Sequence, residues 1–191
     1  MNLFLISLNV EEAAQGLCDQ LCVKMILESV QLLYSVFHMR VGTPKVQTLA
    51  RKYGLVAYKL THKFHPIAIW ARKKVEHYKF LVKYTMALLE EYHYRYGKNH
   101  ACLQHMRMFQ QLKFPKRVVP KEWPKKAKKN RKGVAGTMKF PLCMPEEFHV
   151  KRDGRYDVVQ SYRKFLNHKP YVMRFYYRPP PAWLTNTVKL R

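Results

Sequence analysis

The chain has 191 residues, 48% of them hydrophobic, and it carries 36 Lys and Arg against 12 Asp and Glu. This length and apolar content suit a single folded domain and exclude a disordered polybasic tail. A net charge of +24 repels itself in a compact fold unless a polyanion neutralises it. Nucleic acid is the polyanion that we expect, because phosphate contacts release its condensed counterions.

The positive charge is unevenly distributed along the chain. Residues 1–37 contain one Lys and four acids, so the excess lies in residues 38–191. No run of about 18 apolar residues is present, which predicts no membrane span. The first residues lack the basic region of a signal peptide, and the four cysteines show no repeating spacing, which predicts reduced thiols. We therefore expect a protein that stays inside a cell or a virion and is not secreted.

Helical periodicity predicts two long helices. Asn9 and Glu12 have the spacing of a capping box, and apolar residues then recur at helical spacing, so we predict a largely buried helix from about Val10 to His38. The second pattern begins at His65-Pro66 and ends at Gly97. A phase shift near Lys74 indicates either a kink or two abutting helices.

Shorter elements fill the remaining helical part of the chain. Thr43-Pro44 and Gly54 mark the start and the end of a short helix, and another is predicted to begin at Asn99 and run to Leu112. The predicted fold class is therefore all-α, a compact single helical domain over residues 1–191 with a long inner helix.

The region 114–150 interrupts this pattern. Five prolines break any regular element there, and residues 116–132 contain nine basic residues in seventeen positions. We predict an irregular basic loop insertion. Regular structure is expected to resume near Asp157, and the aromatic, proline-rich segment 175–183 is predicted to form a C-terminal strap.

Lys24 and Glu28 are the candidate catalytic residues. They lie one turn apart on the first helix, so an amine and a carboxylate can meet there. Such an amine could form a Schiff base or take part in acid–base chemistry. The alternative is an ordinary helical ion pair.

The candidate nucleic-acid contacts combine cations with aromatic rings. His65, Trp70 and Arg72 suit the stacking of a base and the binding of a phosphate, although a proline-started helix with a core tryptophan gives the same pattern. The basic loop is expected to contact nucleic acid, the alternative being a role in solubility alone. The predicted nucleic-acid-binding residues are His65, Trp70, Arg72, Lys73, Lys79, Lys83, Arg95, Lys98, Lys116, Arg117, Lys125, Lys126, Lys128, Lys129, Arg131 and Lys132.

No cofactor and no metal ion are predicted. Cys18 with Cys22, and Cys102 with His105, lie about one helical turn apart and could present four zinc ligands. Neither pair has zinc-finger spacing, and cysteines on an apolar helix face are usually buried. The sequence has no glycine-rich phosphate loop, no nucleophile elbow and no acidic cluster for a two-metal nuclease.

Several motifs resemble those of uncharacterised small basic proteins of large DNA viruses and tailed phages. They are Cys18-Asp19 leading to Lys24-Met25 and Glu28, His65-Pro66 to Trp70-Ala71-Arg72, Glu91-Tyr92 with Tyr94-Arg95-Tyr96-Gly97-Lys98, Met144-Pro145, and Tyr162-Arg163. A fainter resemblance is to the phage pyrimidine-dimer DNA glycosylase/AP lyase family, through Asp19-Gln20 followed by Glu28. This second resemblance implies a small all-helical domain in which Glu28 stabilises the ring-opened sugar.

Together these observations predict a DNA-binding protein, with DNA favoured over RNA, that is similar to base-excision glycosylase/AP lyases acting on damaged or modified bases. The alternative is a non-enzymatic virion protein, capsid-associated or genome-neutralising, or a ribonucleoprotein component, with other virion subunits as partners. The expected location is the host cytoplasm, the nucleus or the virion. An open cleft around Lys24 and Glu28 favours the enzyme, and burial of the pair against a partner chain favours the structural protein.

Overall fold

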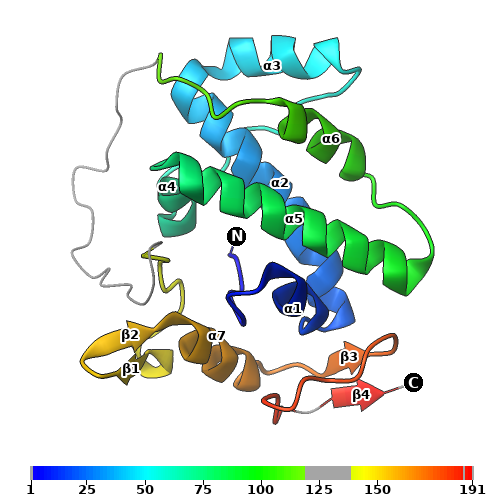
Figure 1. Cartoon of the computed structure of the whole chain (residues 1–191), viewed down its shortest axis with the longest axis vertical. Coiled ribbons are helices and arrows are strands. Elements are labelled where there is room, and N and C mark those ends of the chain that lie inside the picture. The colour runs from blue at the N-terminus through cyan, green and yellow to red at the C-terminus, as the bar shows by residue number, and fades with distance from the viewer. Residues whose placement is uncertain (1, 119–138, 187, 191) are drawn as a thin grey trace.

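Two long helices, α2 (Asp19–Val41) and α5 (Val75–Tyr96), pack against each other at the centre of the molecule (Figure 1). The computed structural model describes residues 2–118, 139–186 and 188–190, which form a mostly helical single domain. Ile26, Leu33 and Leu88 are fully buried where these helices meet the rest of the core. This burial explains why apolar residues dominate α2. The prediction of a long, largely buried inner helix is therefore confirmed.

The predicted helix Val10–His38 is wrong in its continuity. It divides into α1 (Val10–Gln15) and α2, with Gly16 ending the first and Cys18 in extended backbone starting the second. A Cβ atom on Gly16 would lie 2.9 Å from Cδ1 of Ile6, so the N-terminal arm packs directly against this break. The predicted cap is present, because the Asn9 side chain accepts a hydrogen bond from the Glu12 amide.

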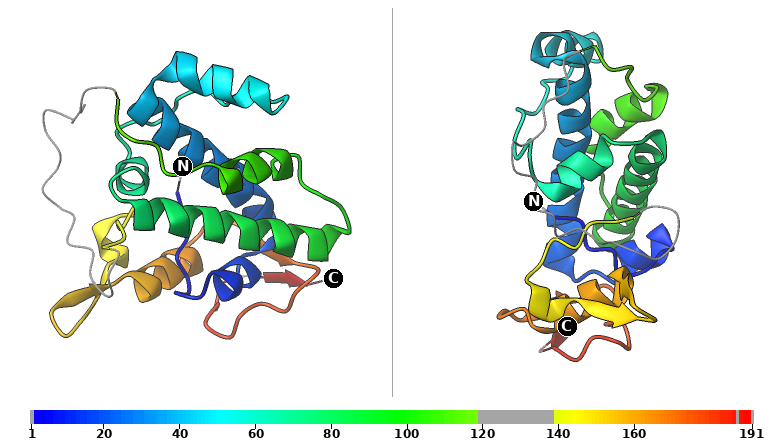
Figure 2. Two further views of the ribbon diagram at one scale, coloured as in Figure 1. Left: turned by 45° about the horizontal axis from the view of Figure 1, so that its top comes forward. Right: turned by 90° about the vertical axis from the view of Figure 1, so that its left-hand side faces the viewer.

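The second long pattern is two abutting helices. α4 (Pro66–Ala71) ends before Lys74, whose extended backbone begins α5, as the phase shift indicated. α3 (Thr43–Lys52) starts as predicted, and α6 (Leu103–Gln111) starts a turn later than expected. α5 and α6 lie side by side in both views of Figure 2.

The all-α prediction is too narrow, because two small sheets accompany the helices. β1 (Val150–Arg152) and β2 (Arg155–Asp157) form an antiparallel hairpin, and β3 (Met173–Phe175) pairs in parallel with β4 (Val188–Leu190). A 3-10 turn, Glu146–Phe148, precedes the hairpin, and α7 (Val158–Asn167) follows it. These elements form the layer at the bottom of Figure 1, below the long helices.

α2 is long and apolar enough to cross a membrane, with a mean hydropathy of 1.2 over its most apolar window. Yet 72% of that window is buried inside the fold. Its side chains are covered by α3, α4 and α5, which is the environment of a core helix. The α2 pattern is therefore accounted for by the packing of this domain.

Candidate nucleic-acid interface and the Lys24–Glu28 pair

Arg40, at the end of α2, fastens the start of the basic loop to the helical core. Its Nε donates a hydrogen bond to the Pro115 carbonyl at 2.6 Å, and its Nη1 donates to the Arg72 carbonyl at 3.1 Å. The Val118 amide donates to the Arg40 carbonyl at 2.7 Å, and the Arg40 guanidinium lies 4.1 Å from the centre of the Phe114 ring. Residues 114–118, the first part of the loop, are thus held beside the end of α4.

This arrangement brings four cations from two parts of the chain to one region, which we call the loop-base surface: Lys73, Lys74, Lys116 and Arg117. All four are exposed. Burial lowers the pKa of the Arg40 guanidinium beneath them, and the positive charge of Arg117 lowers it further. Lys73, Lys116 and Arg117 were predicted from the sequence, whereas Lys74 was missed because it falls at the junction between two helices.

Three other predicted contact residues lie inside the fold and are not available to nucleic acid. The ring of Trp70 stacks on His77 at 4.5 Å and also contacts Phe140 at 4.7 Å, so a base has no access to it. Arg72 and Arg95 are also buried. The structure therefore corrects the proposed stacking and phosphate contacts of these residues in favour of packing roles.

Arg95 forms a buried network with Asp19, Glu91 and Arg178, here called the Arg95 network. Its Nε donates to Glu91 at 2.7 Å, and its Nη1 donates to Asp19 at 2.9 Å. Further bonds reach the carbonyls of Leu17, Ala14 and Gln15, at the end of α1. Arg178, from the C-terminal strap, donates two hydrogen bonds of 2.9 Å to the Glu91 carboxylate. The network thus joins α1, α2, α5 and the strap.

The other predicted nucleic-acid-binding residues fall into three groups: one caps a helix, three are exposed, and six lie outside the described residues. The half-buried His65 caps α4 by accepting a hydrogen bond from the Ile67 amide at 3.3 Å. Lys79 and Lys83 are exposed along α5, and Lys98 is exposed just beyond its end. Outside the described residues lie Lys125, Lys126, Lys128, Lys129, Arg131 and Lys132.

The Lys24–Glu28 pair sits on the open side of α2. Lys24 Nζ lies 3.7 Å from Glu28 Oε1, with side-chain exposures of 65% and 15%. Glu28 Oε2 also accepts a hydrogen bond from the Asn2 backbone amide at 2.8 Å. Asn2 is itself held, because its side chain donates to the Cys143 carbonyl and accepts from the buried Tyr162 hydroxyl. The carboxylate is therefore fixed in position, while the amine is accessible.

Lys169 is an amine close to this pair that the sequence did not reveal. Partial burial lowers its pKa, and the positive charge of Lys24 lowers it further. Its Nζ lies 3.9 Å from the centre of the Phe165 ring. Because Lys169 is more than 140 positions from Lys24 in the sequence, no local pattern could connect them.

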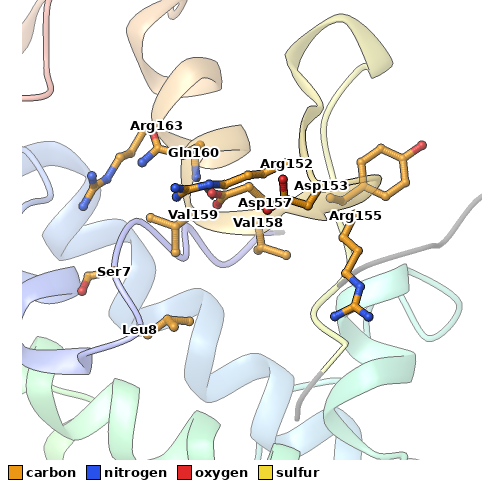
Figure 3. A pocket seen from close by; sticks show the side chains of 11 residues that line it. Ser7, Leu8, Arg152, Asp153, Arg155, Asp157, Val158, Val159, Gln160 and Arg163 are labelled. Atoms are coloured by element: carbon orange, nitrogen blue, oxygen red, sulfur yellow. Dashed lines mark hydrogen bonds between the residues drawn. The ribbon is translucent and has the colours of Figure 1, made fainter. Parts of the chain in front are cut away.

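The β1–β2 hairpin contributes to a second charged cavity, where Asp153 and Asp157 lie among three arginines (Figure 3). Arg152 and Arg155 are paired in register across the Asp153-Gly154 turn, and they line a cavity of about 710 Å³ together with Arg163 from α7. Arg163 is held by the Ile6 carbonyl at 2.9 Å. The hairpin was missed in the sequence, although Asp-Gly is the dipeptide that favours such a two-residue turn, and Asp153 and Gly154 both have positive φ here.

Among the described residues, no three His, Cys, Asp or Glu side chains gather in a way that could hold a metal ion. Burial raises the pKa of the Cys18 thiol and raises that of Cys22 to about 12. Both are buried in the core near the Arg95 network. Cys102 is also buried, and it lies 3.7 Å from the Tyr58 hydroxyl.

Comparison with known protein families, with curated proteins and with solved structures found no match to this chain.

Proposed function

We propose that the protein binds nucleic acid, and DNA in particular, through the loop-base surface and the adjoining basic side of α5. The observation that carries this proposal is the fastening of the loop segment by Arg40, which sets Lys116 and Arg117 beside Lys73 and Lys74. Residues 38–118 contain seventeen Lys and Arg against three acids, and among the described residues Lys73, Lys74 and Lys116 form no ion pair. A polyanion supplies the missing charge.

The binding energy in this proposal comes mainly from counterion release. Each phosphate contacted by a cation frees condensed ions from DNA, so affinity falls with salt by a slope of roughly 0.9 per contact. The exposed lysines of the loop-base surface are suited to this role, because their side chains can reach the phosphates of the DNA backbone without a change in the protein fold. Such contacts position the strand without reading its sequence.

The test is the salt dependence of duplex DNA binding by a double variant, Lys73→Gln with Lys116→Gln. We expect weaker binding and a slope that falls by about 1.8, which corresponds to two lost contacts. The matched control is Arg174→Gln with Lys189→Gln, which removes the same charge from β3 and β4 at the other end of the molecule from α4 (Figure 1). An equal loss of DNA affinity and of salt slope in both double variants would show that binding depends only on the net charge of the protein.

A finer proposal assigns glycosylase/AP lyase-like chemistry to Lys24 and Glu28. The support is their geometry, an accessible amine 3.7 Å from a carboxylate that the Asn2 amide holds in place. The Lys24 amine would attack C1′ of the deoxyribose and expel the base, or water at an abasic site, to give an imine. The Glu28 carboxylate would stabilise the positive charge that develops at that carbon.

Borohydride trapping tests this chemistry, because hydride reduces the imine to a stable protein–DNA adduct. Lys24→Ala is expected to abolish the adduct while sparing DNA binding, and Glu28→Gln is expected to slow it on the order of a hundredfold. An adduct mapped to Lys169 would transfer the amine role to that residue. Full binding without any adduct on abasic or ultraviolet-damaged DNA would favour the non-enzymatic virion or ribonucleoprotein component.

A further inference from the structure

A groove runs between α5 and α6 and encloses a cavity of about 680 Å³; we call it the α5–α6 groove. Its floor includes Val82, Met86 and Phe114, which are all half-buried. Lys79, Lys83 and Lys113 stand along it and are exposed. The α5 residues that line it recur three or four positions apart, so they share one face of the helix.

The charged residues that line this groove are lysines. Among the residues that the structure describes, no acidic residue lines it. Lys83 has an ion pair with Glu11 of α1 at 3.8 Å, but both side chains are largely exposed and solvent screens the pair. In the described part of the chain, Lys79 and Lys113 form no ion pair. The groove thus combines an apolar floor with a basic rim, and two of the three lysines on that rim, Lys79 and Lys113, have no ion pair among the described residues.

The groove is continuous with the loop-base surface. Phe114 lines the groove, and the same ring contacts the Arg40 guanidinium that fastens the loop; Val75, which follows Lys74 of the loop-base surface, lines it as well. Lys116 and Arg117 follow two and three positions later. A strand that contacts the loop-base surface can therefore extend directly into the groove.

We propose that the α5–α6 groove binds an unpaired nucleic-acid strand, with its bases on the apolar floor and its phosphates at the three lysines. This inference rests on the proposed function, and it names the form of nucleic acid that one part of the surface takes. A duplex offers only phosphates, whereas an unpaired strand offers base faces as well, which matches an apolar floor and an aromatic ring. From residue 75 to residue 86 the groove follows α5 for about 16 Å, room for on the order of five stacked nucleotides.

The experiment compares a fluorescent single strand with the duplex of the same sequence, and the single strand carries 2-aminopurine to report base stacking. Wild-type protein is expected to bind the single strand and to quench the 2-aminopurine. Met86→Gln, which keeps size but adds polarity, is expected to weaken single-strand binding at least fivefold and leave duplex binding unchanged. Lys79→Gln with Lys113→Gln should lower the single-strand salt slope by about 1.4, and both lysines are exposed, so the fold is retained.

The outcomes separate the two proposals. Duplex binding without quenching, or single-strand binding that neither variant weakens, would overturn the groove assignment and leave DNA binding in place. Failure of the wild-type protein to bind either nucleic acid would overturn the proposed function itself. An acidic amphipathic peptide that occupies the groove when single strands do not would assign it to a protein partner and also overturn the inference.

Discussion

Arg95 and the lysines of the loop-base surface differ in how their positive charge is compensated. Arg95 has a fully buried side chain, two carboxylate partners and three carbonyl partners. Lys73, Lys74 and Lys116 are exposed, and within the described residues they form no ion pair. A buried charge without partners is strongly destabilising, whereas an exposed one is tolerated and remains available to an external anion. Arg95 is therefore a cation that holds the fold together, whereas the three lysines are cations that an external anion can reach.

Removal of the buried cation gives the largest expected effect. Arg95→Met leaves the carboxylates of Asp19 and Glu91 buried with less compensation, and we expect a loss of about 3–5 kcal/mol in the free energy of unfolding. Chemical denaturation measures it, with Arg107→Met on the exposed face of α6 as the control. A loss below about 1 kcal/mol would remove the distinction between the two kinds of cation.

The interior is also expected to respond to pH in a way that the surface does not. Burial lowers the pKa of His38 and of His77 below 6.5. In the neutral form His38 donates to the Tyr58 carbonyl and His77 donates to the Trp70 carbonyl. The unfolded chain therefore takes up protons first, so stability is complete above about pH 6.5 and falls as the pH drops towards the lowered values.

Each of these histidines contributes at most about 1.4 kcal/mol per pH unit to that loss. Measurement of the free energy of unfolding from pH 7.5 to 5 tests this loss of stability. His38→Gln should make the free energy of unfolding depend less on pH. Stability that is independent of pH would contradict the burial of both rings.

A cation at the border of the Arg95 network should show an intermediate effect. The Arg178 side chain is 27% exposed and binds Glu91, while its guanidinium lies 3.8 Å from the centre of the Tyr94 ring. Because Glu91 keeps Arg95 as a partner, Arg178→Gln is expected to cost only about 1–2 kcal/mol. Limited proteolysis of Arg178→Gln should then begin in the strap. A loss of unfolding free energy as large as that of Arg95→Met would show that the two arginines stabilise the fold equally.

The smallest expected effect is that of Lys24→Ala. The Lys24 side chain is 65% exposed, its ion pair with Glu28 spans one helical turn, and Glu28 keeps its hydrogen bond from the Asn2 amide, so the loss of Lys24 should change stability by less than about 0.5 kcal/mol. Thermal unfolding measures this change. A stable Lys24→Ala protein ensures that any loss of borohydride trapping reflects chemistry, whereas a large destabilisation would make the pair a structural element.

Local patterns in the sequence predicted the helices but not the partners of individual charges. α2 and α5 followed from their apolar period, because each buries a continuous face. The break at Gly16 did not, since it depends on Ile6 pressing against the backbone. Arg95 was taken for a surface cation because its partner Asp19 lies 76 positions away. Lys73 and Lys116 were predicted singly, and only the bonds of Arg40 show that they share a surface.

Lysine acetylation read by mass spectrometry, with and without duplex DNA, tests the central distinction most directly. We expect DNA to protect Lys73, Lys74 and Lys116 from acetylation, while Lys189 on β4, also exposed, reacts at an unchanged rate. Equal protection of Lys189, or unchanged reactivity at the loop-base surface under saturating DNA, would show that this surface is not where DNA binds.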